Sequence, residues 1–285
     1  MREQKHFSLI IVVVLLLVFG GVFYYAIDSL TKEITPVPRS AHGSPGSSAK
    51  AASVEALKAA VAKSDIAAIK SATDKAGGIN GQFPLLESGR RQISLLTYAA
   101  MQGDAKLIAG LLAAGAKLEN ASDDWGTPLM MAAAKGDLAS LNELLKAGAK
   151  VEDRNKWGET ALILAARFGT PEKVKALIDA GATVVKADNE GNTALSAAAG
   201  SDSPAIIVKM LLDAKGEVDV ANKDGVTPLM QAAKLGDLEK CVMLLDAGAK
   251  VSLKDSNSWT AYDWAKQRAD EPGEKCAAFL AQAGR

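Results

Sequence analysis

The chain has 285 residues, of which 48% are hydrophobic but only 5% are aromatic. Alanine and leucine therefore supply most of the apolar surface, which favours thin, closely packed helices over a core of large rings. Lysine and arginine total 33, as do aspartate and glutamate, so the formal net charge is +0. A nucleic-acid-binding protein carries a basic excess that displaces counterions from phosphates, so nucleic acid is not the expected partner.

The first predicted element is a transmembrane helix at residues 7–27, FSLIIVVVLLLVFGGVFYYAI, after a short tail at residues 1–6. At about 1.5 Å per residue, this uncharged stretch spans the roughly 30 Å hydrocarbon layer of a bilayer. Phe23, Tyr24 and Tyr25 stand near its end, where aromatic rings favour the membrane interface. The alternative is a cleaved signal peptide, which has a shorter apolar stretch of about 7–15 residues followed by a small-residue cleavage site.

The charges that flank this stretch give an expected orientation. Arg2 and Lys5 precede it, and Lys32 and Arg39 follow it, so the positive-inside rule favours a cytoplasmic N-terminus only slightly. The tail before the helix is also so short that its position gives little further evidence about which end of the chain crosses the membrane. We therefore expect a single-pass protein of a bacterial inner membrane whose remaining residues lie in the periplasm.

Residues 28–52 are predicted to be a flexible linker. Proline, glycine and serine dominate this stretch, and no apolar residue recurs at a regular spacing. Such a sequence cannot bury enough surface to offset its ordering entropy. It would hold the next domain away from the membrane.

The rest of the chain repeats itself. Copies of a T-P-L-x-x-A pattern begin at Thr127, Thr160, Thr193, Thr227 and Thr260. The intervals are 160−127 = 33, 193−160 = 33, 227−193 = 34 and 260−227 = 33. Ser94 opens a looser copy, SLLTYAA. A fixed period of this length indicates a stack of identical modules.

The residues that begin and end helices in one copy predict two helices and a turn. Thr127 is the expected N-cap of the first helix, with Pro128 at its first position. Gly136 is expected to end that helix in a left-handed conformation. Asp137 then caps a second helix, which Gly148 stops, and an extended finger leads to the next copy.

This repeat is similar to that of the ankyrin repeat family, and the resemblance covers residues 53–285 in about seven units, the outer two serving as caps. It implies an all-α solenoid of helix-turn-helix repeats with finger loops and a concave surface that binds proteins. The chain would then be a membrane-tethered scaffold or adaptor. Bacterial ankyrin proteins that resemble this one are sometimes associated with periplasmic catalases, so an accessory that protects or assembles such an enzyme is the alternative.

The sequence departs from the family pattern in two ways. The histidine that usually follows T-P-L is replaced, which predicts greater reliance on apolar packing; the residues in its place are Met130, Ile163, Ser196, Met230 and Asp263. In the fourth copy Lys215 replaces a helix-ending glycine, and an extra residue enters near 200–203. That copy should be the least regular.

The sequence offers no catalytic or metal-binding constellation. Its two histidines, His6 and His42, precede the repeats, which excludes histidine-based triads and mixed Cys/His zinc sites there. Carboxylates such as Asp104, Asp137 and Asp237 stand where helices need caps. We therefore expect no enzyme activity, no metal and no cofactor.

The two cysteines occupy similar sequence contexts, EKC at Cys241 and EKC at Cys276. Equivalent positions on stacked helices lie about 8–10 Å apart, whereas a disulfide requires Cα atoms within about 7 Å. We interpret both as small buried residues, with a disulfide as the alternative.

The predicted partner-binding residues are charged and aromatic side chains at the finger tips and on the open side of the first helices. They are Asp124, Trp125, Lys135, Lys156, Trp157, Arg167, Phe168, Glu190, Asp224 and Trp259. Tryptophan and arginine are enriched at interaction hot spots, and Trp125 and Trp157 could form one apolar patch. The alternative is that each tryptophan packs on a neighbouring finger and stiffens the loop.

Overall fold

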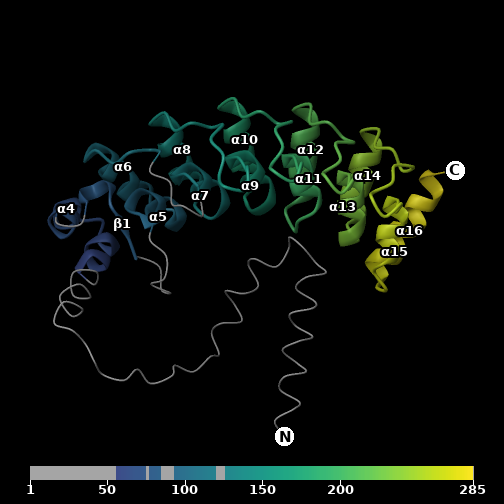
Figure 1. Cartoon of the computed structure of the whole chain (residues 1–285), viewed down its shortest axis with the longest axis horizontal. Coiled ribbons are helices and arrows are strands. Elements are labelled where there is room, and N and C mark those ends of the chain that lie inside the picture. Colours follow the sequence, from purple (N-terminus) through teal and green to yellow (C-terminus); the bar gives the residue numbers. More distant parts are fainter. Residues whose placement is uncertain (1–55, 75–76, 85–92, 120–125, 285) are drawn as a thin grey trace, which may run out of the picture. The chain divides into compact units, whose positions relative to one another are not determined.

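The computed structural model describes residues 56–74, 77–84, 93–119 and 126–284 (Figure 1). The predicted tail, transmembrane helix and linker at residues 1–52 lie outside these ranges. Within the described ranges, every helix is too short or too polar to cross a bilayer.

Helices in two layers make up most of the described chain (Figure 1). The first helix of each repeat forms the inner layer: α5 (Leu95–Gln102), α7 (Pro128–Ala134), α9 (Ala161–Phe168), α11 (Ala194–Ala199), α13 (Pro228–Leu235) and α15 (Ala261–Lys266). The second helices form the outer layer: α6 (Ala105–Ala113), α8 (Leu138–Lys146), α10 (Pro171–Asp179), α12 (Ala205–Asp213), α14 (Leu238–Asp246) and α16 (Glu271–Ala283). Each helix contacts its counterpart in the next repeat. The predicted all-α solenoid is confirmed.

The N-terminal end of the stack is a modified repeat. Helical residues 56–62 and α4 (Ile66–Thr73) supply the expected helix pair. A 3-10 turn, η2 (Gly78–Asn80), follows. Two short strands, β1 (Gln82–Phe83) and β2 (Ile93–Ser94), then pair antiparallel, with Gln82 opposite Ser94. The sequence does not predict these strands, because two residues are too few to show an alternating pattern.

Side-chain caps are present at every inner helix, whereas Thr170 of α10 and Pro204 of α12 form no capping hydrogen bond. The hydroxyl of the capping residue accepts a hydrogen bond from the amide three residues later in all six inner helices, at Ser94, Thr127, Thr160, Thr193, Thr227 and Thr260. The carboxylates of Asp137 and Asp237 accept the equivalent hydrogen bond at the start of α8 and α14. Carboxylates at these positions also face the positive end of the helix dipole. Their capping role is therefore structural.

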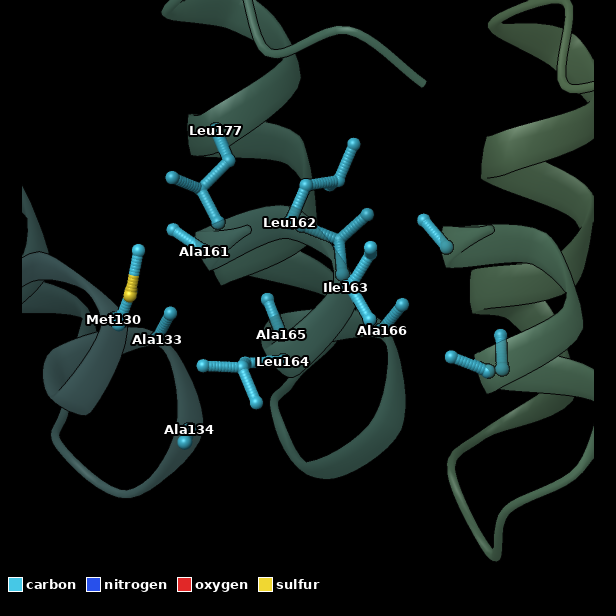
Figure 2. Close-up of a cluster of buried hydrophobic side chains, with 14 of the residues drawn as sticks. Met130, Ala133, Ala134, Ala161, Leu162, Ile163, Leu164, Ala165, Ala166 and Leu177 are labelled. Atoms are coloured by element: carbon cyan, nitrogen blue, oxygen red, sulfur yellow. The ribbon is translucent and has the colours of Figure 1, made fainter. Parts of the chain in front are cut away.

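Small side chains let the inner helices approach one another closely. Ala133, Ala165 and Ala166 are fully buried, and Leu162 and Leu177 fill the space toward the outer layer (Figure 2). Each buried methylene contributes about 0.8 kcal/mol, and the benefit is shared between neighbouring repeats. The expected core of alanine and leucine is confirmed.

Gly136 is required for a different reason from the one expected. Helix α7 ends at Ala134 and is capped by Lys135, and Gly136 is not among the residues with a positive φ. A Cβ at Gly136 would instead stand 2.2 Å from the carbonyl oxygen of Ala100 in the preceding repeat. The glycine therefore permits close approach between repeats, whereas Gly148 does adopt the left-handed conformation, with a φ of 87°.

The fourth repeat is irregular at both predicted places. Lys215 has a φ of 64°, where other repeats have a glycine such as Gly181 or Gly248. Pro204 stands at the N-cap of α12 without a side-chain hydrogen bond, and Ser203 bonds instead to the carbonyl of Ala198. The extra residue is thus accommodated by a serine-rich turn.

Two buried lysines tie neighbouring repeats together. The ammonium of Lys173 donates to the carbonyls of Gly136 (2.9 Å) and Ala132 (3.3 Å) in the preceding repeat, and burial lowers the pKa of Lys173. Lys240, 1% exposed, occupies the same place in its own repeat and donates to the carbonyl of Ser201. Both ammonium groups stand near the C-terminal end of an inner helix, where the helix dipole favours a cation.

Candidate functional site

Each described finger tip is built around one short polar side chain. The Oδ1 atom of Asn155 accepts hydrogen bonds from the amides of Trp157 (3.0 Å) and Glu159 (2.9 Å). Asp188, Asn222 and Asp255 repeat this arrangement, each accepting from the amides two and four residues later. Such turns fix the backbone of the finger tip.

Backbone hydrogen bonds join each of these fingers to the next. The amide of Asn189 donates to the carbonyl of Trp157 at 2.9 Å. In the following fingers, the amide of Lys223 donates to the carbonyl of Glu190 (2.9 Å), and the amide of Ser256 donates to the carbonyl of Asp224 (2.8 Å). These bonds place the predicted residues Trp157, Glu190 and Asp224 at equivalent positions of consecutive fingers. We call them the finger row.

All three side chains of the finger row are exposed, and Trp157 retains 39% of its surface. The ammonium of the predicted residue Lys156 lies 4.6 Å from the centre of the Trp157 ring, a cation–π contact. Asp124 and Trp125, and with them the predicted patch of two tryptophans, lie outside the described residues. The binding role of these side chains stays a prediction.

Ion pairs between successive fingers neutralise many of their charges. Lys186 lies 2.8 Å from Glu152 in the preceding finger, and Lys223 lies 3.9 Å from Glu190. Burial alone would raise the pKa of Glu152, but hydrogen bonds from Lys186 and Thr183 outweigh it and hold that pKa below its usual value. The finger edge therefore presents largely balanced charge.

The inner helices bring a second group of predicted residues to the open side of α7 and α9. Lys135 is exposed at the end of α7, and Phe168 is 41% exposed at the end of α9. The guanidinium of Arg167 pairs with the buried carboxylate of Glu159 and lies 5.6 Å from the Phe168 ring. Asn155 donates to the other oxygen of Glu159 at 2.9 Å, so this carboxylate is fully engaged.

A cluster in the last two repeats contains residues that sequence reasoning missed. The predicted residue Trp259 meets Trp264 edge to face, with ring centres 5.4 Å apart. The indole nitrogen of Trp264 donates to Asp255 at 3.0 Å, and the ammonium of Lys234 lies 5.0 Å from the Trp264 ring. The sequence contains a signal that identifies Lys234, because this residue stands seven positions after its capping threonine, as the predicted residue Arg167 does.

The two cysteines are free and fully buried, but they are not equivalent as expected. Cys241 is the fourth residue after the cap Asp237, whereas Cys276 is the sixth after the cap Asp270. The two thiols nevertheless contact each other. A hydrogen bond from this contact, together with burial, raises the pKa of Cys241. Neither thiol faces solvent.

The described residues offer no obvious place for a small ligand. No group of three or more His, Cys, Asp or Glu side chains within them could hold a metal ion. Two open hollows of about 310 and 360 Å³ lie at the C-terminal repeat and share Tyr262 and Ala281. They are remote from the finger row and from Arg167 and Phe168.

Comparison with known proteins gives the same architecture. A family model described as ankyrin repeats (3 copies) matches residues 96–188, 129–217, 183–255 and 198–284. The crystal structure of the human ASB11 ankyrin repeat domain aligns with a TM-score of 0.64 and 24% sequence identity, over 79% of this chain and 96% of that chain. At this identity the likeness concerns the fold alone. A search of curated proteins gave no match.

Proposed function

Because this chain belongs to the ankyrin repeat family, we propose that it is a membrane-tethered adaptor that holds a partner protein and catalyses no reaction. Solenoids of this kind present extended concave surfaces that generally serve protein–protein interaction. The partner would lie against the fingers and the open side of the inner helices. An accessory role beside an enzyme is one form that such an adaptor could take.

The observation that carries this proposal is the finger row. Its backbone is fixed by side-chain turns and by bonds between fingers, and its side chains Trp157, Glu190 and Asp224 are all exposed. A rigid frame lowers the entropy lost when a partner binds. Exposed tryptophan beside a cation is a common hot-spot composition.

The proposed tether is the uncharged stretch at residues 7–27, and the proposed compartment is the bacterial periplasm. The support for both is sequence alone: the length of the stretch and the cations that flank it. Protease treatment of intact cells and of spheroplasts tests the sidedness. Digestion of the repeats in spheroplasts, with protection in intact cells, is expected, whereas protection in both would place them in the cytoplasm.

Photo-crosslinking in native membranes tests the adaptor function. A photoreactive amino acid replaces Trp157 in the full chain, and covalent adducts are identified by mass spectrometry. We expect one dominant protein adduct. The matched control carries the same amino acid at Lys175, which is exposed on the outer helix α10. Equal adducts from both positions, or none from Trp157, would contradict the proposal.

A further inference from the structure

Two positions on the open side of the inner helices hold charged residues of one sign only. The seventh and eighth positions after each capping residue form a line along this side, which we call the inner strip. Its charged residues are Lys135, Arg167, Lys234 and Arg268, and no copy has a carboxylate at either position. Since the chain as a whole has a formal net charge of +0, these cations do not reflect a general basic excess.

The outer helices carry charges of both signs. Helices α10, α12 and α14 end in Asp179, Asp213 and Asp246, all exposed. Lysines one turn earlier pair with the first two, Lys175 at 2.8 Å and Lys209 at 3.2 Å. The outer layer thus pairs many of its charges internally, whereas the charged residues at the two positions of the inner strip are all cations. A surface organised in this way favours partners of the opposite charge.

The cations of the inner strip stand beside apolar rings. Arg167 lies over Phe168, and Lys234 lies over Trp264, whose orientation is fixed by its hydrogen bond to Asp255. Arg167 already has Glu159 as a partner and Arg268 has Asp270, whereas Lys234 forms no ion pair with any carboxylate of the described residues. A ligand group that matches Lys234 is therefore a carboxylate with an apolar neighbour.

The repeat between these two cations has only small side chains on its open side. Gly200 and Ser201 stand there, and the side chain of Gln231 on α13 lies beside Gly200. Neighbouring helices lie about 8–10 Å apart, so α9 and α13 are separated by about 20 Å. An extended chain covers this distance in about six residues.

We propose that the inner strip binds an acidic segment of the partner protein. This inference rests on the proposed protein-binding function. One carboxylate pairs with Lys234, and a second, about six residues away, lies near Arg167. An apolar side chain between them covers the small residues of α11. The finger row, in which Glu190 is paired with Lys223, makes the flanking contacts.

Two other polyanions could meet the same cations, a nucleic acid and an anionic membrane. Neither supplies an apolar side chain between its charges at this spacing. The balanced net charge of the chain also gives a long nucleic acid no extended basic surface. We therefore favour the peptide and treat the other two as outcomes of the test.

The test uses the full chain in non-ionic detergent micelles and fluorescence anisotropy. The probe is a fluorescein-labelled peptide in which two glutamate pairs flank a phenylalanine-leucine centre. Lys234→Gln and Lys234→Glu should weaken its binding about threefold and tenfold, because one close charge contact is lost or reversed. Salt should weaken it further. The matched control, Lys209→Glu on α12, should change the affinity less than twofold.

Several results would overturn the proposal. They are equal binding of a peptide with lysine in place of glutamate, no effect of Lys234→Gln, or equal binding of a duplex DNA or of phosphatidylglycerol vesicles. Failure of the glutamate probe to bind would do so as well. If Lys234→Glu leaves the adducts formed from position 157 unchanged, the adaptor function stands and only the acidic-segment inference fails.

Discussion

The buried lysine of the fifth repeat allows a quantitative test of what holds neighbouring repeats together. Lys240 is 1% exposed, and its ammonium reaches the carbonyl of Ser201. Truncation in Lys240→Ala removes three methylene groups, about 0.8 kcal/mol each, and leaves a buried carbonyl unpaired at a cost of about 1–3 kcal/mol. Relief from burying a charge offsets part of this loss. We expect a net destabilisation of about 3 kcal/mol.

The Lys240→Met variant separates the contribution of the buried aliphatic stem to stability from that of the ammonium charge. Methionine keeps most of the buried length and removes the desolvation cost, so the variant should lie within about 1 kcal/mol of the wild type. The measurement is thermal unfolding of the full chain in micelles by circular dichroism, where 1 kcal/mol corresponds to about 2–4 °C.

The control for this pair is Lys209→Ala, which removes an exposed lysine paired one turn away with Asp213. Its effect should stay below about 0.5 kcal/mol. If Lys240→Met proves as destabilising as Lys240→Ala, the bond to Ser201 dominates, and the assignment of stability to the buried stem is wrong.

Three further changes have expected outcomes. Lys215→Gly should raise the free energy of unfolding by about 0.5–1 kcal/mol, because a φ of 64° is strained for lysine; a thermal midpoint at or below that of the wild type would contradict this. Ser140→Ala should be neutral or stabilising by about 1 kcal/mol in urea unfolding, because its buried hydroxyl lacks a hydrogen-bond partner. Asp270, the N-cap of α16, has its pKa lowered to about 2 by the Arg268 hydrogen bond. Between about pH 4 and 2 the unfolded state binds more protons there, so stability should fall as pH falls, and Asp270→Asn should flatten that slope in acid unfolding curves.

The parts of the fold that follow from local chemistry could be predicted from sequence. Thr127 followed by Pro128 has few structural roles other than starting a helix, and the regular spacing fixed the helix order. Gly136 was identified as special for the wrong reason, because its closest neighbour, the carbonyl of Ala100, belongs to another repeat. The contact between Cys241 and Cys276 was not predicted, because Cys276 stands two positions further from its helix cap than Cys241 does.

The candidate site was predictable only where a side chain could be assigned to an edge of the repeat. Trp157, Glu190 and Asp224 were found because finger tips lie at fixed offsets from the capping threonine. Trp264 was missed because its position in other copies holds residues that belong to the core, such as Leu164. Lys173 and Lys240 look like surface residues in sequence, since lysine is rarely buried.

The buried lysines also explain how this stack manages without the histidine of its family. That histidine position holds Met130, Ile163 and Met230 in three repeats, all fully buried and unable to form strong hydrogen bonds. Lys173 and Lys240 restore polar ties between repeats from the outer layer. Each of these ties runs from an outer helix to the end of the inner helix in the preceding repeat, so it joins the two layers as well as the two repeats.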